Sequence, residues 1–537
     1  MSGRCARCAL RRARSVERRV PALFYWSPPA LQPATTGDVA VNPEKAYEEM
    51  VALSRAETLL ASCLDLLEWD EEVCMPKSGV EHRAEQRALL AGLVHDRGTD
   101  PRYEELLGVI EGSSLVSDPD SPAAVNVREI RRSFDKERRM PRRLVEEWAR
   151  VTAVAQATWA ESRRRDDYAS FAPWLERIFA LARERADAVG YEGVRYDALL
   201  DDFEPGMTTD RLTSLFAHLQ TKLVPLVASL RDTASTRDEL AGEFPVERQK
   251  QFVEQAAATL GFDLRGGRLD VGQHPFCSNI GPGDVRIALR YHPQDFGQGF
   301  FALLHELGHG LYDQGLDSQH YGTPLGDFAS LGVHESQSRM WENLVGRSEG
   351  FWRHFYPKLC DAFPDALHDV SLQTFRRVVN RVAPSVIRVN ADEVTYDLHV
   401  AIRFELELAL LSGDLRAAEL PGAWNELYAR HLGIRPANDR EGCLQDIHWS
   451  EGLIGYFPTY TLGNVYAAQM FAAAERAVGP LEESFARGEF APLREWLREH
   501  VHRHGMRWPV PALIERVTGE VPNPAYLVES LTRRYGR

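Results

Sequence analysis

Apolar residues recur at intervals of three and four along most of the chain, the spacing that collects them on one face of a helix. This pattern predicts helices over residues 43–68, 78–96, 141–165, 171–188, 209–232, 246–260, 296–315, 391–411, 463–477 and 508–517. The first helix should begin at Asn42 and Pro43, a good N-cap followed by the residue favoured at the first helical position. Alternation with a period of two is scarce, and its clearest instance runs from Asp284 to Tyr291.

The predicted helices follow one another without a visible boundary. No internal repeat and no Gly/Ser-rich or Pro-rich linker interrupts residues 42–537. We therefore expect one large, mainly α domain over residues 42–537.

Residues 1–41 differ from the rest. The first twenty hold seven arginines and one glutamate, and the remainder is rich in Ala, Pro and Thr without a sustained helical or strand period. The excess of arginine over acidic residues resembles that of a transit peptide. However, serine is scarce and no cleavage pattern is evident. We expect a disordered N-terminal tail over residues 1–41.

The overall composition narrows the class of protein. Of the 537 residues, 44% are hydrophobic and 26% are charged, which is typical of a globular chain. The formal charge of −15 would repel a phosphate backbone, so we expect no nucleic-acid partner. No apolar run approaches the roughly 18–20 residues that span a bilayer, so we expect no membrane partner. Seven scattered cysteines suit a reducing compartment and predict a cytoplasmic protein.

The helix predicted over residues 296–315 carries a cluster of reactive side chains. Its apolar positions form one stripe, made of Phe300, Leu304, Leu307 and Leu311. His305 and His309 lie one turn apart and point the same way, so both can bind one Zn²⁺ at about 2.0–2.1 Å. Glu306 lies beside them and can take a proton from zinc-bound water, whose pKa the metal lowers towards about 7. The His-Glu-x-x-His pattern therefore predicts a hydrolytic zinc centre.

A catalytic zinc centre needs a third protein ligand and one open position. Glu335 lies 26 residues beyond His309, which allows a turn and the start of a second helix that packs back on the first. His320 and Asp313 are rival third ligands. We interpret Asp313 as a carboxylate that holds an imidazole and His320 as a loop residue.

Several motifs in order resemble those of the carboxypeptidase Taq family of zinc metallocarboxypeptidases. The resemblance runs from about residue 45 to the C-terminus and includes His305 to His309 and His334 to Gln337. Its other motifs are Trp69 to Pro76, Arg83 to Gln86, Tyr196 to Gly206, His274 to Phe276, Asp284 to Arg286, Ile387 to Ala391, Gly442 to Trp449 and Gly455 to Tyr460. One departure is Ala288, which stands where the family's Asp-x-Arg-x-Thr motif ends in threonine and so removes a hydroxyl from a strand expected to line the cleft.

The resemblance implies both a fold and an activity. The fold would be an all-helical metallopeptidase with a deep active-site cleft, lined by a small edge strand or sheet, and the protein would be a homodimer. The activity would be removal of C-terminal residues from peptides that have a free C-terminus. Arg388 matches the arginine that binds the substrate carboxylate in the family, a task for which the planar guanidinium supplies two parallel hydrogen bonds.

Further site residues follow from the same resemblance. Tyr460 resembles the tyrosine that donates a hydrogen bond to the oxyanion in related zinc peptidases, with Tyr456 as the alternative. His448 is expected to add another donor. Asp284 and Arg286 are expected to contact the substrate, and Arg286 is the alternative carboxylate-binding residue.

The sequence thus predicts a zinc carboxypeptidase that releases single C-terminal amino acids, in which Co²⁺ or Mn²⁺ can replace Zn²⁺. One alternative is a zinc oligopeptidase or dipeptidyl carboxypeptidase of the same architecture. Another, of a different class, is an inactive peptide-binding scaffold. Glu306 argues against the scaffold, because a binding protein needs no water-activating base.

Overall fold

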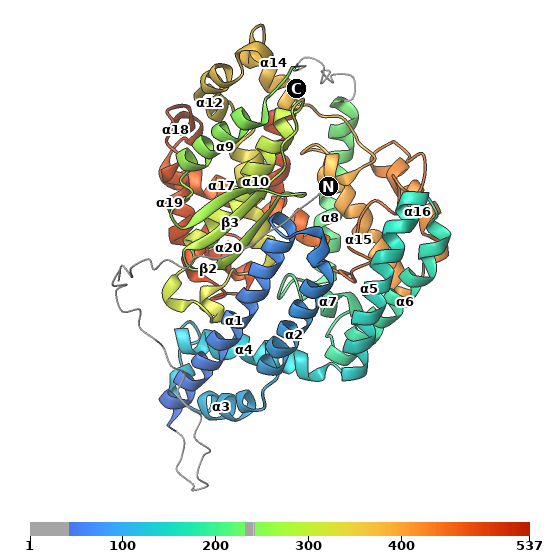
Figure 1. The fold of residues 1–537 in the computed structure, drawn as a ribbon, viewed down its shortest axis with the longest axis vertical. Helices are drawn as coiled ribbons and strands as arrows, with labels where there is room; N and C mark the ends of the chain where they lie inside the picture. Colours follow the sequence, from blue (N-terminus) through green and yellow to red (C-terminus); the bar gives the residue numbers. More distant parts are fainter. Residues whose placement is uncertain (1–41, 231–239, 241, 537) are drawn as a thin grey trace, which may run out of the picture. The chain divides into compact units, whose positions relative to one another are not determined.

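Helices follow one another along almost the whole of the computed structural model, which describes residues 42–230, 240 and 242–536 (Figure 1). The described residues form one unit that begins at Asn42. The predicted tail over residues 1–41 lies outside them. Up to the sheet the helices are α1 (Pro43–Val73), α2 (Val80–Gly98), α3 (Arg102–Glu111), α4 (Pro122–Arg139), α5 (Arg142–Arg165), α6 (Tyr168–Val189), α7 (Arg195–Leu200), α8 (Thr209–Leu230) and α9 (Val246–Leu260).

The second part of the chain begins with the only sheet of the described residues and continues as helices. The strands are β1 (Gly267–Val271), β2 (Phe276–Gly281) and β3 (Asp284–Leu289). The helices are α10 (Phe296–Gly315), α11 (Leu331–Arg339), α12 (Glu349–Ala362), α13 (Pro364–Leu367), α14 (Leu372–Val379), α15 (Tyr396–Ser412), α16 (Leu420–His431), α17 (Pro458–Val478), α18 (Leu481–Ala486), α19 (Ala491–His500), α20 (Val510–Thr518) and α21 (Ala525–Tyr535). The predicted mainly α fold class is therefore confirmed.

The predicted start of α1 is confirmed by its capping contacts. The Asn42 side chain accepts hydrogen bonds from the backbone N–H groups of Glu44 and Lys45, and Pro43 is the first helical residue. These contacts satisfy N–H groups that have no partner inside the helix.

The sheet has the order β1-β3-β2, with β3 in the centre. β3 runs parallel to β1 and antiparallel to β2, and its apolar residues Val285, Ile287 and Leu289 are buried beneath α10. Only β3 follows from the sequence pattern. β1 and β2 were not predicted, because their side chains are mixed in polarity and their pairing with β3 is not local.

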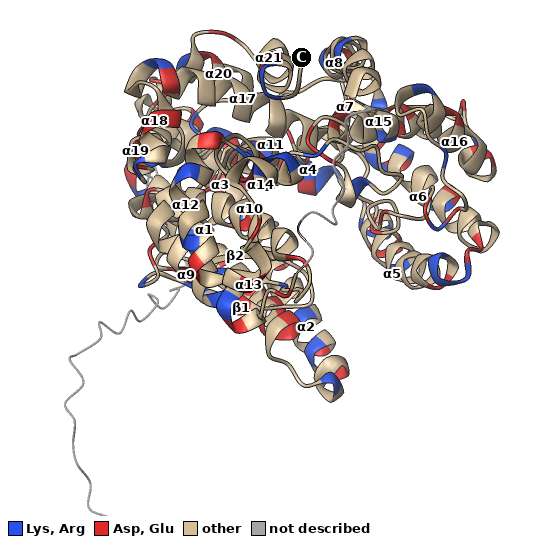
Figure 2. Cartoon of the chain, turned by 90° about the horizontal axis from the view of Figure 1, so that it is seen from above, with Lys and Arg blue, Asp and Glu red and all other residues tan. Residues whose placement is uncertain are grey.

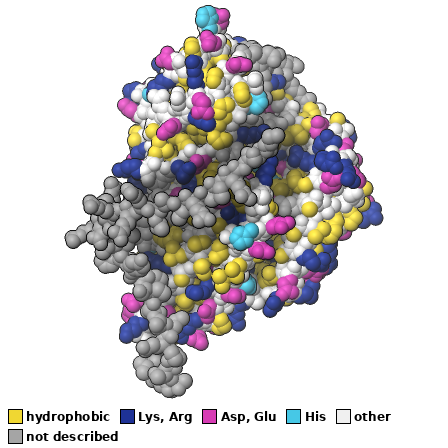
Figure 3. Space-filling model, in the orientation of Figure 1, with side chains coloured by type: hydrophobic (Ala, Val, Ile, Leu, Met, Phe, Trp, Pro, Cys, Tyr) yellow, Lys and Arg dark blue, Asp and Glu magenta, His cyan; other side chains and the backbone are white. Residues whose placement is uncertain are grey.

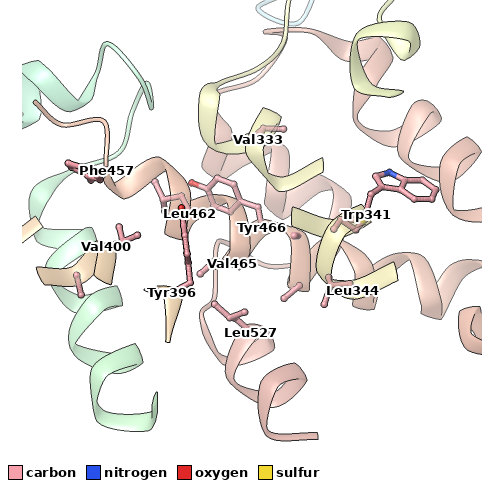
Figure 4. Packing of buried hydrophobic residues seen from close by; sticks show 14 of the residues in the cluster. Val333, Trp341, Leu344, Tyr396, Val400, Phe457, Leu462, Val465, Tyr466 and Leu527 are labelled. Carbon is pink, nitrogen blue, oxygen red and sulfur yellow. The ribbon is translucent and has the colours of Figure 1, made fainter. Parts of the chain in front are cut away.

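Three helices cross at the centre of the described chain. α11 packs against α10 on one side and against α17 on the other. Figure 4 shows Val333 of α11 above Tyr466 of α17, a helix that also contributes Leu462 and Val465 to this core. The two crossings are close because Gly308 and Gly463 lie at the contact points. A Cβ on Gly308 would come within 2.4 Å of the Gln337 carbonyl oxygen.

α1 and α2 form a hairpin that the rest of the chain covers only in part. α2 contributes no buried residue, and α1 is buried only near its two ends. The exposed fractions are 51% for Leu59, 41% for Leu66, 67% for Leu89 and 44% for Leu93. Leu59 and Leu66 share one face of α1, as Leu89 and Leu93 share one face of α2. Figure 3 has hydrophobic side chains among charged ones where Figure 1 draws this hairpin.

Candidate metal centre and substrate site

The two predicted histidine ligands lie on α10, whose N-cap Asp295 accepts a hydrogen bond from the Gln298 N–H. The apolar stripe of this helix is buried, as the sequence predicted. His305 and His309 lie beside it and keep 23% and 15% of their side chains exposed. A folded helix therefore holds both imidazoles at the edge of the core.

Glu335 on α11 meets both histidines. Its Oε2 lies 3.6 Å from His305 Nε2 and 3.5 Å from His309 Nε2. One ligand atom from each of the three residues lies within 4.8 Å of the others. Two imidazole nitrogens and one carboxylate oxygen that converge in this way fit a Zn²⁺ ion with three protein ligands.

Two contacts fix Glu335 at this place. Gly463 of α17 lies so close that an added Cβ would be 2.5 Å from Glu335 Cγ. At the start of α11, the buried carboxylate of Glu204 accepts hydrogen bonds from the Gly332 N–H at 3.0 Å and the Tyr466 hydroxyl at 2.9 Å. Glu204 thereby joins α11 to α17 one turn before Glu335.

Charged groups that the sequence reasoning missed surround the three ligands. Glu342 accepts a hydrogen bond from His305 Nδ1 at 2.9 Å, and Arg339 donates to Glu335 Oε1 at 2.8 Å. Glu342 lies in a π-helical segment, Met340–Val345, that continues α11. Of these contacts, only the spacing of four residues from Glu335 to Arg339 is a signal that the sequence contains.

Glu306 follows His305 directly and is only 8% exposed. Burial raises the pKa of its carboxyl to about 7, although the neighbouring His305 acts in the opposite direction. A carboxylate whose pKa lies near neutrality can both accept and return a proton, which is the property of a general base.

The rival third ligands lie elsewhere. Asp313 does hold an imidazole, as expected, but it is that of His334, at 3.1 Å from Nε2. The His334 ring in turn stacks on His309, with centroids 4.4 Å apart. His320 ends a short 3₁₀ turn and is not part of the ligand cluster.

Arg388 lies in a 3₁₀ turn, Arg388–Asn390, and is only 5% exposed. Its Nε and Nη2 donate to Asp446 Oδ1 at 3.0 and 2.8 Å, and its Nη1 donates to the Tyr396 hydroxyl at 3.0 Å. A guanidinium has five N–H donors, so one on each Nη is left without a partner among the described residues. The Nη1–Nη2 edge can therefore bind one more carboxylate.

The charges around Arg388 do not cancel. Arg403 also binds Asp446, at 2.6 Å. Burial opposes the ionisation of Asp446, but the two guanidinium groups hold its pKa far below the usual range. Burial lowers the pKa of His448 to about 3, so this imidazole is neutral at pH 7. Within the buried triad of Arg388, Arg403 and Asp446, two cations and one anion leave one positive charge.

The predicted oxyanion donors lie next to this cluster. The Tyr460 hydroxyl is 3.1 Å from His448 Nε2, and the Tyr460 ring lies 4.9 Å from the Arg388 guanidinium carbon. Tyr460 lies in the first turn of α17, which begins at Pro458 and so earlier than the predicted start at residue 463. Tyr456 packs on Tyr460 with centroids 5.3 Å apart. The structure thus brings Arg388, His448 and both tyrosines together.

Asp284 and Arg286 bind each other instead. The Arg286 Nε and Nη2 donate to the two Asp284 oxygens at 2.7 and 2.6 Å, and the guanidinium lies 5.7 Å from the Trp69 ring. No hydrogen bond or ion pair joins Asp284 or Arg286 to the ligand cluster among the described residues. Ala288 is fully buried, on the same face of β3 as Asp284 and Arg286 and opposite Val285, Ile287 and Leu289.

Comparisons with known proteins show the family of this chain. Residues 49–535 match the model of the carboxypeptidase Taq (M32) metallopeptidase family. Thermostable carboxypeptidase 1 of Thermus thermophilus is 49% identical over 92% of this chain and 99% of its own length. Carboxypeptidase 1 of Bacillus subtilis is 38% identical over 88% of this chain and 94% of its own.

A solved relative has the same fold. The crystal structure of the M32 carboxypeptidase from Deinococcus radiodurans R1 superposes with a TM-score of 0.89 at 40% identity, and covers 92% of this chain and 99% of that one. Within the described part of the chain, no helix is long and apolar enough to cross a membrane. The family match, the relatives and the fold agree, and this chain belongs to the carboxypeptidase Taq family of metallopeptidases.

Proposed function

We propose that this metallocarboxypeptidase uses zinc and a water activated by Glu306 to release single C-terminal amino acids from peptides. The observation that carries the proposal is the unbalanced buried charge at Arg388, which favours a substrate with a terminal carboxylate. A protease that cuts within chains has no use for such a charge.

The donor set fits a zinc ion held by His305, His309 and Glu335. A bound zinc ion would polarise the scissile carbonyl and lower the pKa of a water molecule. Cobalt or manganese suits the same nitrogen and oxygen donors, so either can replace zinc. The Nδ1–H of His305 donates to Glu342, which leaves Nε2 free to act as the ligand atom.

The protein's own groups then divide the chemistry among them. Glu306 accepts the proton of the attacking water and returns it to the amine that leaves. The Tyr460 hydroxyl supplies a hydrogen bond near the carbonyl, where negative charge develops, and the neutral His448 imidazole orients this hydroxyl by donating to it from Nε2. Arg388 binds the α-carboxylate and so orients the last peptide bond towards Glu306. Tyr456, Asp284 and Arg286 remain proposed contacts to the substrate beyond these groups.

Mass spectrometry of a mixed peptide pool tests this function directly. Peptides with a free C-terminus should lose one residue at a time, and a chelator should stop the reaction until Zn²⁺, Co²⁺ or Mn²⁺ is restored. Loss of residues in pairs, or cuts within the chain, would favour a dipeptidyl carboxypeptidase or an oligopeptidase. No cleavage by protein that holds stoichiometric metal would favour a peptide-binding scaffold.

We also propose that the enzyme is a cytoplasmic homodimer. The apolar stripes of α1 and α2, which the rest of the chain leaves exposed, support a second copy as the partner, because two-fold contacts join identical surfaces. All five described cysteines carry free thiols, which suits a reducing compartment. Basic and acidic residues are interspersed along the described helices in Figure 2, and we propose no nucleic-acid partner for this acidic chain.

A further inference from the structure

Two largely buried charged side chains, Arg339 and Glu342, contact the ligand cluster through atoms that do not face the metal position. Arg339 keeps only 13% of its side chain exposed. Its Nε donates to Glu335 Oε1 at 2.8 Å, and its Nη1 donates to Glu342 Oε2 at 3.4 Å. Arg339 therefore contacts both the carboxylate ligand and the carboxylate that orients His305.

The two oxygens of Glu335 have different partners. Oε2 faces both histidines and accepts a hydrogen bond from the Ser338 hydroxyl at 2.9 Å. Oε1 points the other way and is bound by Arg339. A free carboxylate can bind a metal through one oxygen or through both. Here Oε1 already accepts a charge-assisted hydrogen bond from Arg339, so it is not available to the metal.

An aromatic ring fixes the plane of this guanidinium. The guanidinium carbon of Arg339 lies 4.1 Å from the centroid of the Tyr396 ring. The hydroxyl of the same tyrosine accepts a hydrogen bond from Arg388 Nη1. Tyr396 thus contacts both Arg388, the proposed carboxylate-binding residue, and Arg339, which binds the ligand Glu335. It fixes the positions of the two side chains relative to each other.

We propose that Arg339 is a positioning residue that makes Glu335 bind the metal through Oε2 alone. The inference rests on the proposed metal site and deepens it. Single-oxygen binding by Glu335 leaves the open coordination position to the substrate and the attacking water, whereas a second oxygen would occupy it. Glu342 balances the charge of Arg339, so the pair orients both ligands without adding net charge to the site.

Only arginine supplies all three contacts. Its planar fork reaches two carboxylates while its face lies on Tyr396, whereas a lysine is a point charge that can satisfy one carboxylate at a time. Arg339→Lys should therefore keep part of the bond to Glu335 and lose the rest. Arg339→Met keeps the length and apolar packing of the side chain and removes every donor.

The test measures metal binding rather than turnover. Wild type, Arg339→Met and Arg339→Lys are titrated with Zn²⁺ in competition with a chromophoric chelator, and each is loaded with Co²⁺ for visible spectroscopy. We expect the Zn²⁺ dissociation constant to rise 10-fold to 100-fold in the Met variant and less in the Lys variant. The Co²⁺ bands of the Met variant should weaken, because a second Glu335 oxygen raises the coordination number.

Arg83→Met is the matched control. Arg83 keeps 12% of its side chain exposed and binds a carboxylate, Asp70, at 2.6 Å, and its other hydrogen bonds among the described residues go to Leu67 and Gln86, outside the ligand cluster and the segment Met340–Val345. It should lose stability without any change in the dissociation constant or the Co²⁺ spectrum.

Three outcomes separate the claims. Arg339 variants that are folded by circular dichroism and match wild type in both readouts overturn the positioning role. Should the Met variant fail to fold, the Lys variant decides by the same two readouts. Wild-type protein that binds no stoichiometric metal would instead contradict the proposed metal site itself.

Discussion

Gly463 of α17 lies against the side chain of Glu335, and an added Cβ would come within 2.5 Å of Cγ and 2.9 Å of Cβ. Real Cβ atoms do not approach other heavy atoms so closely, so Gly463→Ala must displace Glu335 or separate the two helices. We expect the variant to lose about 1–3 kcal/mol of stability through overpacking. We also expect its affinity for Zn²⁺ to fall at least about tenfold.

The control for this prediction is Gly422→Ala in α16, where an added Cβ would meet no atom within 4 Å. It should keep wild-type metal affinity and be as stable as wild type or slightly more stable. Thermal denaturation and chelator competition measure both variants. Wild-type affinity in the Gly463 variant would mean that the crossing of α11 and α17 does not set the position of Glu335.

Glu306→Gln tests the proposed base. The amide has the shape of the carboxylate and leaves His305, His309 and Glu335 untouched, but it cannot accept the proton of water. Metal content should therefore stay at wild-type level while turnover falls by orders of magnitude. Elemental analysis and a peptidase assay on the same sample check both parts, and near wild-type turnover would assign the base to another group.

Arg388→Ala tests recognition of the terminal carboxylate. Loss of a charge-assisted bond worth about 1.5–3 kcal/mol should lower kcat/KM on free-acid peptides at least about tenfold. Arg388→Lys should recover little, because an ammonium lacks the planar fork. The same peptide with a C-terminal amide is the control. Wild type should cleave it poorly, and the Ala variant should lose little more. Equal losses on acid and amide would transfer the carboxylate-binding role to Arg286.

The buried carboxyl of Glu204 makes stability depend on pH. Burial raises its pKa to about 7, above the ordinary value of 4.5, so the folded state binds the proton more tightly than the unfolded state. Its contribution to the free energy of unfolding is complete below about pH 4.5 and is lost as the pH rises through 7. The shift corresponds to about 3 kcal/mol.

Glu204→Gln should flatten this dependence, because an amide does not ionise and can still accept from the Gly332 N–H. Some slope should remain, since burial also raises the pKa of Glu407 to about 7. Urea unfolding at pH 5 and pH 8 measures the difference. An unchanged slope in the variant would mean that Glu204 is ionised in the folded protein throughout this range.

The helices were predictable because each combines a local period with a local stop signal. The helix with the metal-binding histidines was predicted over residues 296–315, and α10 has these bounds. The helix predicted from residue 391 begins instead at Tyr396. The Asp392 side chain accepts hydrogen bonds from the backbone N–H groups of Ala383, Val394 and Thr395. These bonds hold the residues around Asp392 in a turn, so the helix begins after it.

The surroundings of the candidate site were harder to predict than its centre. His305, Glu306 and His309 lie within about one turn of one helix, so their relative positions follow from their spacing in the sequence. Glu342 is 37 residues away from His305 in the sequence, and its position depends on the π-helical segment Met340–Val345 that follows α11. Asp284 and Arg286, the predicted substrate contacts, are two residues apart on one face of β3 and bind each other, which their spacing alone did not show. Which polar groups meet depends on packing between distant segments.

The positive charge left over around Arg388 and Arg403 also affects what happens after cleavage. Burying an unbalanced charge is unfavourable, so the substrate-free enzyme is less stable than the same fold with a carboxylate bound. A released amino acid still carries the α-carboxylate that this cluster attracts. The product should therefore both raise the melting temperature and compete with the next peptide, so that free amino acids in the surroundings would slow the enzyme and stabilise it at the same time.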